Sequence, residues 1–241
     1  MSASPLPEES QAWKQAYRDP ALMARRMKKH RGKLARLGVF DWPRDAKVLD
    51  LCCGTGEVLR ILHAEGFTKL AGLDVTVDAE LQREPWVELQ AGDSRALPFA
   101  DASFDAVLCM HALHHLVVQA SGLHAAGTAA PQALGGVSGI GAALREAARV
   151  LKPGGRLALI DHYDSAQLRL AFWACRQAWL TWPTAGLRSF RRQLDEEWPY
   201  LTDYLNNWPQ VRAAIGGLGF QPVDLDAQAL FFFYWTGRKP I

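Results

Sequence analysis

Short apolar runs alternate with amphipathic segments between Lys47 and Tyr163. The apolar runs have the length of strands, whereas the segments between them carry apolar residues at the spacing of a helix face. Alternation of this kind is typical of βαβ units, in which helices cover both faces of a parallel sheet. In chain order, the predicted elements are KVLDL, GEVLRILHAEG, KLAGLDV, WVELQAG, FDAVLCM, AALREAARVLKPGG and RLALIDHY.

An N-terminal arm, residues 1–40, precedes this pattern. Within the arm, residues 9–38 are predicted to be helical, because apolar residues from Met23 to Leu37 recur near helical spacing and basic residues fill the positions between them. We interpret the arm as a helix that packs by its apolar stripe and exposes its basic face. A lid over a ligand site and a contact with an anionic membrane are the alternatives.

Residues 119–141 interrupt the alternation with small residues, glycines and one proline. Such side chains bury too little apolar area to offset an ordering entropy of about 1 to 2 kcal/mol per residue. We therefore expect this segment to form a surface excursion outside the sheet.

Two further regions follow the alternating core, residues 46–162. Residues 165–215 predict helices rich in arginine and aromatic side chains, including Trp173, Trp179, Trp182, Trp198 and Trp208. Residues 219–238 read as two strands, and the connection between them is too short for a parallel crossover, so this final pair is expected to be antiparallel. Together these regions are predicted to form one domain, residues 1–241.

The composition is that of an ordinary globular protein. A chain of 241 residues with 49% hydrophobic and 22% charged residues is long enough to bury roughly 70 to 75% of its unfolded surface in one core. The formal net charge of +2 provides no overall field that favours nucleic acid, so no nucleic-acid partner is expected.

The four cysteines fit a reducing compartment. Cys52 and Cys53 are adjacent, whereas Cys109 and Cys175 stand alone, so they form neither a disulfide framework nor a metal-binding motif. The N-terminus carries no signal-peptide pattern, and no stretch approaches the roughly 20 apolar residues of a membrane span. The expected location is the cytoplasm.

The stretch VLDLCCGTGEVL predicts a ligand-binding turn. It places Gly54, Thr55 and Gly56 between the first strand and the first helix, at the sheet edge where open α/β folds bind ligands. Asp74 ends the next strand, close to the spacing of about 20 residues at which an acid takes ribose hydroxyls. Asp93 follows the third strand and is placed to accept from an adenine amino group.

With FDAVLCMHALHHL and LREAARVLKPGGRLALID following in order, residues 46–162 resemble the class I S-adenosylmethionine-dependent methyltransferases. The resemblance is to the small-molecule branch that includes the quinone-biosynthesis methyltransferases. It implies a Rossmann-like, seven-stranded, mainly parallel sheet with the last strand antiparallel, helices on both faces, the N-terminal arm and a helical substrate cap over residues 165–215. It also implies S-adenosyl-L-methionine as cofactor and a small, apolar or aromatic methyl acceptor. A dinucleotide dehydrogenase would usually carry a third glycine where this sequence has Leu59.

Carried over residue by residue, the resemblance places the methionine part of the cofactor beside Asp50 and Gly54, the ribose at Asp74 and the sulfonium along the end of the fourth strand. The implied cofactor site consists of Asp50, Cys52, Gly54, Thr55, Gly56, Asp74, Val75, Asp93, Ser94, Cys109 and Met110. Cys52 replaces the first glycine of the family motif, and we expect it and Cys53 to be packing residues.

Three histidines are the candidate catalytic residues. His114 is the first choice as general base, and His111 and His162 are the reserves, because all three follow strands four and five at the same sheet edge. Helical geometry beyond Met110 is expected to bring His111 and either His114 or His115 to similar faces. A purely structural hydrogen bond is the alternative for each histidine. No metal is expected, because no carboxylate or cysteine completes a recognisable ligand set.

Two other functions stay open beside methyl transfer. One is a protein that binds S-adenosylmethionine without transferring the methyl group, as a scaffold or a pericyclase-like relative. The other is a membrane-surface lipid methyltransferase, which the basic arm would support through weak contact with anionic lipid. The motifs concern the methyl donor only and leave the acceptor, its reacting atom, the need for a base and the oligomeric state open.

Overall fold

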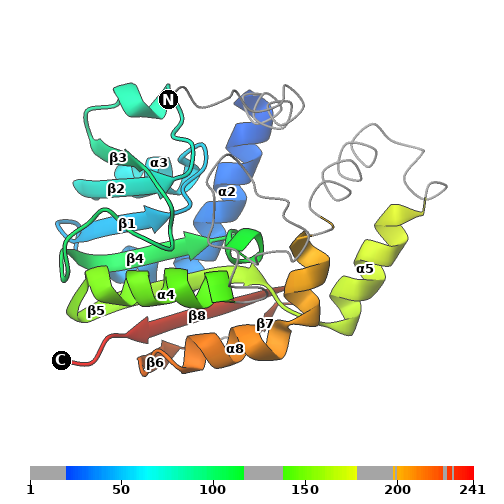
Figure 1. Ribbon diagram of the computed structural model, residues 1–241. Coiled ribbons are helices and arrows are strands. Elements are labelled where there is room, and N and C mark those ends of the chain that lie inside the picture. The colour runs from blue at the N-terminus through cyan, green and yellow to red at the C-terminus, as the bar shows by residue number, and fades with distance from the viewer. Residues whose placement is uncertain (1–19, 117–137, 178–197, 199, 225–226, 230) are drawn as a thin grey trace, which may run out of the picture.

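In the part of the chain that the structure describes, the strands form one eight-stranded sheet in the order β3-β2-β1-β4-β5-β8-β6, with β7 paired to β8 (Figure 1). This computed structural model describes residues 20–116, 138–177, 198, 200–224, 227–229 and 231–241. The strands are β1 (Lys47–Leu51), β2 (Lys69–Asp74), β3 (Val87–Ala91), β4 (Phe104–Met110), β5 (Leu151–His162), β6 (Gln221–Asp224), β7 (Ala227–Ala229) and β8 (Phe232–Arg238).

Strands β1 to β5 are parallel, whereas β8 runs antiparallel to β5 and also to β6 and β7. The expectation of a mainly parallel sheet with its last strand antiparallel is therefore confirmed. The expected number of strands is corrected from seven to eight, because the segment between β6 and β8 contains the short strand β7. The parallel central strands are buried along nearly their whole length, which explains why their sequences are almost continuously apolar.

Helices cover both faces of the sheet (Figure 1). The helices are α2 (Pro20–Arg36), α3 (Glu57–Ala64), α4 (Ser138–Val150), α5 (Ala166–Arg176) and α8 (Trp208–Gly216), and the short 3-10 helices are η1 (Val39–Asp41), η2 (Leu81–Arg83) and η3 (Leu113–Leu116). The core has two parts: one packs α2 and α3 residues such as Leu34 and Leu59, and the other packs α4 and α8 residues such as Leu144 and Val211.

Helix α4 corrects two expectations. Of the excursion predicted over residues 119–141, residues 119–137 lie outside the described part of the chain, but α4 already begins at Ser138 and buries Ile140 completely. The predicted helical segment AALREAARVLKPGG also ends early, because α4 stops at Val150 and β5 starts at Leu151. Pro153 disfavours helical backbone in the residue before it, which accounts for this early end.

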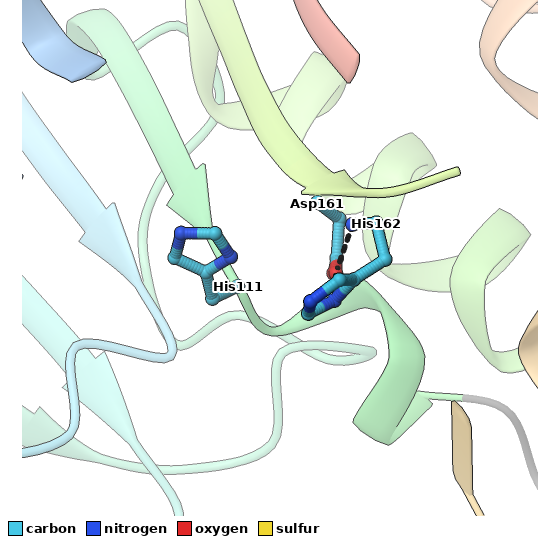
Figure 2. Close-up of side chains that lie close together, drawn as sticks. All are labelled: His111, Asp161 and His162. Carbon is cyan, nitrogen blue, oxygen red and sulfur yellow. Dashed lines mark hydrogen bonds and ion pairs between the residues drawn. The ribbon is translucent and has the colours of Figure 1, made fainter. Parts of the chain in front are cut away.

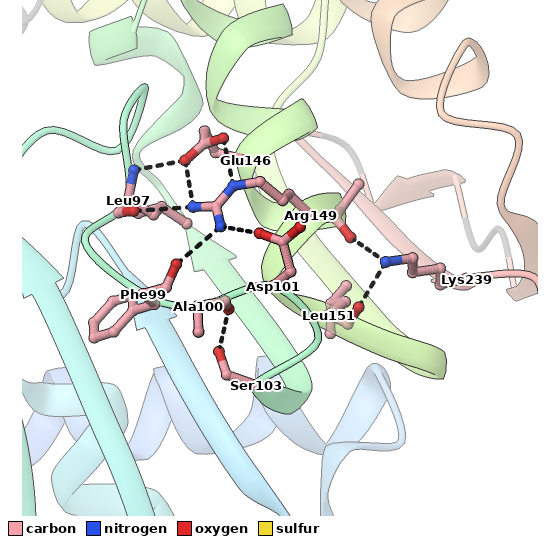
Figure 3. Close-up of polar contacts among 10 residues, drawn as sticks. Leu97, Phe99, Ala100, Asp101, Ser103, Glu146, Arg149, Leu151 and Lys239 are labelled. Atoms are coloured by element: carbon pink, nitrogen blue, oxygen red, sulfur yellow. Dashed lines mark hydrogen bonds and ion pairs between the residues drawn. The ribbon is translucent and has the colours of Figure 1, made fainter.

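Arg149 ties the end of α4 to the loop that follows β3 (Figure 3). Its guanidinium donates to the carbonyl oxygens of Leu97 and Phe99, each at 2.9 Å, and to the carboxylates of Glu146 and Asp101. Lys239, just beyond β8, donates to two carbonyl oxygens at the same helix end, each at 2.7 Å. These contacts satisfy carbonyl groups that would otherwise lack partners.

Of the helix predicted over residues 9–38, residues 20–36 form α2, which ends two residues earlier than predicted; residues 1–19 lie outside the described chain. The helix packs beside α3, where Arg31 pairs with Glu65 at 2.6 Å and Arg26 pairs with Glu57 at 3.0 Å. Its exposed basic residues are Arg25, Lys28, Lys29, Arg31 and Arg36. Within the described residues, every helix is too short or too polar to cross a bilayer.

Candidate active site

The turn between β1 and α3 has left-handed backbone at three positions. Gly54 has a φ of 53° and Gly56 a φ of 77°, a region that glycine enters without steric cost. A Cβ atom on Gly56 would lie 2.2 Å from Cδ2 of the buried Leu81, so this position also needs glycine for close packing. A Cβ on Gly54 would meet nothing within 4 Å, so open space borders the turn there.

Cys52 is the third residue of the turn with left-handed backbone, at a φ of 61°. A side chain in this conformation costs about 1 to 2 kcal/mol, which the family's usual glycine would avoid. Burial raises the pKa of the Cys52 thiol to about 12, and nearby Asp74 adds to the effect. The thiol is therefore neutral and is neither a nucleophile nor a metal ligand at ordinary pH, in line with its expected packing role.

Asp74 ends β2 beside this turn. Its Oδ2 accepts a hydrogen bond from the Gly54 amide at 2.9 Å, and its Oδ1 accepts one from the Thr76 amide at 3.2 Å. Two backbone donors thus hold the carboxylate at the carboxyl edge of the sheet, and each oxygen keeps lone-pair capacity for a further donor. The next side chain, Val75, is 52% exposed, which suits contact with a flat apolar ring.

Asp50 is the deepest acid of the site and is only 2% exposed. Its Oδ2 is buried and has no hydrogen-bond partner within the described residues. Burial raises the pKa of Asp50 well above its usual range, and the neighbouring acids Asp74 and Glu57 raise it further. A bound amino group would relieve both the missing hydrogen bond and the repulsion between the acids, so this site fits the charged methionine part of S-adenosylmethionine.

The remaining predicted cofactor residues differ in how accessible they are. Both oxygens of Asp93 are held by the Arg95 guanidinium, with the shortest contact at 2.6 Å, so an adenine amino group would have to compete with Arg95.

Ser94 is buried and interacts with the Cys52 side chain. Cys109 is 1% exposed and packs into the core, so it offers a ligand only its backbone. Thr55 bonds to the Glu57 carboxylate, and Met110 is partly buried at the end of β4.

Asp161, at the end of β5, connects two of the candidate histidines. Its side chain is fully buried, and it accepts from His114 Nδ1 at 2.9 Å, from the His114 amide at 3.2 Å and from the His162 amide at 2.7 Å. His162 Nδ1 lies 3.2 Å from the same carboxylate (Figure 2). Burial alone would raise the pKa of Asp161, but His114 and His162 hold it well below its usual range. Asp161 is therefore an anion that fixes the orientation of both rings.

His111 does not share a helix face with His114 or His115, so that expectation is wrong. His111 has left-handed backbone with a φ of 55°, its amide donates to the Ile160 carbonyl at 2.7 Å, and the following helix η3 begins only at Leu113. The bond to Ile160 continues the pairing of β4 with β5 and turns the chain away from a helical path. Tertiary pairing has overridden the local pattern.

Lys33 of α2 is a site residue that the sequence analysis missed. Its Nζ lies 2.6 Å from His111 Nε2 and 3.8 Å from the centre of the Phe232 ring. Burial lowers the pKa of His111 well below its usual value, and the Lys33 charge lowers it further. His111 is thus neutral and accepts a hydrogen bond from Lys33, which makes it a poor general base while that contact persists.

Aromatic side chains from the helical segment 165–215 and from β8 lie beside the histidines. The centre of the His162 ring lies 4.8 Å from that of Phe232 and 6.0 Å from that of Phe172 of α5. The His114 ring lies 6.2 Å from Tyr204, whose buried hydroxyl finds no hydrogen-bond partner in the described chain. Residues 200–206, which carry Tyr204, are helical. The surroundings of the histidines are thus aromatic with polar atoms at their centre.

His111, Asp161 and His162 form a group whose potential ligand atoms all lie within 4.8 Å of one another (Figure 2). From the sequence, no carboxylate was expected to complete such a set, and the structure corrects that point. However, His111 Nε2 already faces the Lys33 amine, and Asp161 already accepts several N–H groups. These lone pairs are used by protein donors, so the arrangement is better suited to holding and moving protons than to binding a cation.

Comparison with known proteins gives matches in sequence and in structure. The family profile described as "Methyltransferase domain" matches residues 49–159. A 2-phytyl-1,4-naphtoquinone methyltransferase of Thermosynechococcus vestitus is 30% identical over 197 residues, which cover 76% of this chain and 77% of that protein. A demethylmenaquinone methyltransferase of Bacillus licheniformis is 32% identical over 142 residues, 56% of this chain and 51% of the relative.

Solved structures share the fold. A Haloferax volcanii methyltransferase structure, determined with the activator Trm112, superposes with a TM-score of 0.59 at 19% identity and covers 98% of this chain and 100% of its own. At this identity the match concerns the architecture alone. It agrees with the mainly parallel sheet and its antiparallel strand.

Proposed function

Because the chain belongs to the class I S-adenosylmethionine-dependent methyltransferase family, we propose that its small acceptor is an aromatic ring bearing a hydroxyl group, of the reduced naphthoquinone kind. The relatives named for phytyl-naphthoquinone and demethylmenaquinone support this acceptor class. The observation that carries the proposal is the buried Asp161 with its two attached histidines, beside aromatic side chains and at the same carboxyl edge of the parallel strands as the glycine turn.

The proposed donor site is the edge formed by the turn after β1 and the end of β2. Asp50 would hold the amino group of the methionine part, Gly54 would leave room for it, and Asp74 would hold the ribose hydroxyls. The fit rests on the unpaired Asp50 oxygen, the open space at Gly54 and the carboxylate already oriented at Asp74. When bound, S-adenosylmethionine supplies a methyl group activated by the sulfonium charge. Orientation of the acceptor against it can supply up to roughly 7 to 11 kcal/mol of the barrier reduction.

His114 is the proposed general base. Its Nδ1 donates to Asp161, which makes Nε2 the basic nitrogen of the neutral ring and stabilises the ring after it takes a proton. The acceptor hydroxyl would give its proton to that nitrogen and become a stronger nucleophile. His162 has the same kind of contact with Asp161 at 3.2 Å and is the reserve candidate.

The segment 165–215 is proposed to be the acceptor-recognition part of a single domain. Phe172 and Tyr204 come from this segment and face the histidines that follow β4 and β5. Rigid aromatic side chains present a large apolar area with little entropy loss, which suits a planar ring.

Two finer points concern location. We propose a cytoplasmic enzyme, which the four free cysteines support. We also propose a weak contact between the exposed basic residues of α2 and an anionic membrane, because an acceptor with a long apolar tail resides in lipid. The protein is expected to float with anionic liposomes at low salt and to lose this binding at high salt. Absence of binding at low salt would contradict the membrane contact without affecting the proposed cytoplasmic location.

The acceptor class is tested by incubating the purified protein and S-adenosylmethionine with a 1,4-naphthoquinone in its reduced or its oxidised form. Release of S-adenosylhomocysteine and a methylated product are expected with the reduced form only. Tight binding of S-adenosylmethionine without turnover on any reduced ring would favour a protein that binds the cofactor without transferring its methyl group.

A further inference from the structure

Lys33 brings a positive charge from α2 to the end of β4. Its Nζ contacts His111 Nε2 at 2.6 Å and lies 3.8 Å above the Phe232 ring. Its side chain is partly buried between these groups. No carboxylate in the described part of the chain lies within ion-pair distance of Nζ, and the nearest influential acid is Asp161, which His114 already engages.

The ammonium group has unused donor capacity. It carries three N–H groups and no acceptor. One N–H group donates to His111, and a second can face the Phe232 ring. The third N–H group has no protein acceptor in the described chain. A partly buried cation with an unfilled donor and no carboxylate is unfavourable by itself, and an oxygen anion bound beside it would remove that cost.

The surroundings of Lys33 place such an anion near His162, the reserve candidate for the base. The centre of the His111 ring, against which Lys33 rests, lies 5.9 Å from the centre of the His162 ring. His162 in turn contacts Asp161, the partner of His114. One acceptor oxygen could thus face a proton acceptor on one side and the lysine on the other.

We propose that Lys33 binds the ionised oxygen of the methyl acceptor and so selects ring hydroxyls that ionise. This inference rests on the proposed function and deepens it by assigning how the acceptor is recognised. Loss of the hydroxyl proton to a histidine leaves the negative charge on the acceptor oxygen, and Lys33 keeps its own proton while donating a hydrogen bond. His111 acts as a positioning residue that holds the amine in place.

Charge complementarity decides in favour of an anion over a neutral ligand. The methyl donor carries a positive sulfonium, and Lys33 adds a second positive charge at the same sheet edge. An anionic acceptor is attracted to both charges, whereas a neutral or cationic acceptor does not reduce the repulsion between them.

The test compares equilibrium binding of two unreactive probes to the full-length protein. The probes are 2-hydroxy-1,4-naphthoquinone, an anion at neutral pH, and 2,3-dimethyl-1,4-naphthoquinone, which is neutral and has no free ring position for thiol addition. The variants are Lys33→Met, Lys33→Arg and, as a matched control on the exposed face of the same helix, Lys28→Met. Affinity for S-adenosylmethionine is measured in each variant to show that the donor site is intact.

Wild type and Lys28→Met are expected to prefer the anion, and Lys33→Met should lose about 10-fold to 100-fold of its affinity for the anion with little change for the neutral probe. Lys33→Arg should retain part of the preference. A Lys33→Met variant that keeps the preference, or a wild type that shows none, overturns the inference. If reduced naphthoquinones are not methylated but the preference depends on Lys33, the inference holds for another ionisable acceptor and the proposed acceptor class fails.

Discussion

Lys33 in α2 and His111 at the end of β4 are separated by 78 positions in the sequence, yet Lys33 Nζ and His111 Nε2 lie 2.6 Å apart. The contact makes the N-terminal helix part of the candidate acceptor site, beside the two histidines attached to Asp161. On the proposal above, the helix would contribute to acceptor binding in addition to packing beside α3.

This contact predicts a pH dependence for anion binding. Burial lowers the pKa of Lys33 to about 8, with Lys29 adding to the effect and Asp161 opposing it. Lys33 is protonated below that pKa and neutral above it, so affinity for 2-hydroxy-1,4-naphthoquinone should fall as the pH rises through about 8. The pKa values of His30, His111 and Asp161 are all lowered. The two histidines therefore stay neutral, and Asp161 stays charged, as the pH rises through about 8.

The measurement is a binding titration from about pH 6 to about pH 10. Lys33→Arg is the control, because an arginine stays charged over the whole range and should flatten the profile. An identical fall in wild type and Lys33→Arg would assign the titration to another group.

Asp74 is expected to anchor the cofactor ribose. Replacing it in Asp74→Ala removes an oriented carboxylate and should weaken S-adenosylmethionine binding by about 1.5 to 3 kcal/mol, measured by calorimetry. Glu80→Ala changes an exposed acid beyond the same strand and should bind normally. Unchanged affinity in a folded Asp74→Ala protein would mean that the ribose binds elsewhere.

The two glycines of the turn should respond differently to alanine. In Gly56→Ala the new Cβ would lie 2.2 Å from Leu81 Cδ2 at a φ of 77°, so unfolding free energy should fall by about 1 to 3 kcal/mol. In Gly54→Ala nothing lies within 4 Å of the new Cβ. Its stability cost should be limited to the backbone strain, about 1 to 2 kcal/mol, while cofactor affinity falls because the methyl group occupies the ligand's space.

Urea denaturation and calorimetry on both variants separate these effects. Full cofactor affinity in Gly54→Ala would show that the open space beside the turn is not the donor site.

The sequence was sufficient for features that depend on local pattern. The strands from β1 to β4, helix α3 and the turn at Gly54 and Gly56 follow from apolar periodicity and from the need for positive φ. Features that depend on tertiary contacts were not predictable in this way. Nothing in the sequence separates Lys33 from the other basic residues of α2, because only the packing of that helix brings it to His111.

The position of the histidines shows the same limit. A helical continuation after Met110 was a reasonable local expectation, but the bond from the His111 amide to the Ile160 carbonyl redirects the chain. The contact of Asp161 with His114 depends on the pairing of β4 with β5 and on the course of the chain after β4.

Arg149 should contribute to stability without contributing to catalysis. Arg149→Met leaves the Leu97 and Phe99 carbonyl oxygens without their donor and should lower the unfolding free energy by about 1 to 3 kcal/mol. Arg145→Met, one turn earlier and exposed on the same helix, should have little effect. Thermal or urea unfolding checks both, and equal stability of the two variants would contradict the assigned role.

The most direct test of the central claim is a single-turnover reaction. It combines S-adenosylmethionine labelled in its methyl group with a reduced 1,4-naphthoquinone that carries no methyl group on its ring. The account predicts that wild type transfers the label to the ring compound, and that His114→Gln binds the donor normally but transfers the label about 10² to 10⁴ times more slowly. His115→Gln, on the exposed neighbour in η3, should remain close to wild type. Label that stays on the donor in wild type, or equal rates in wild type and His114→Gln, would contradict the account.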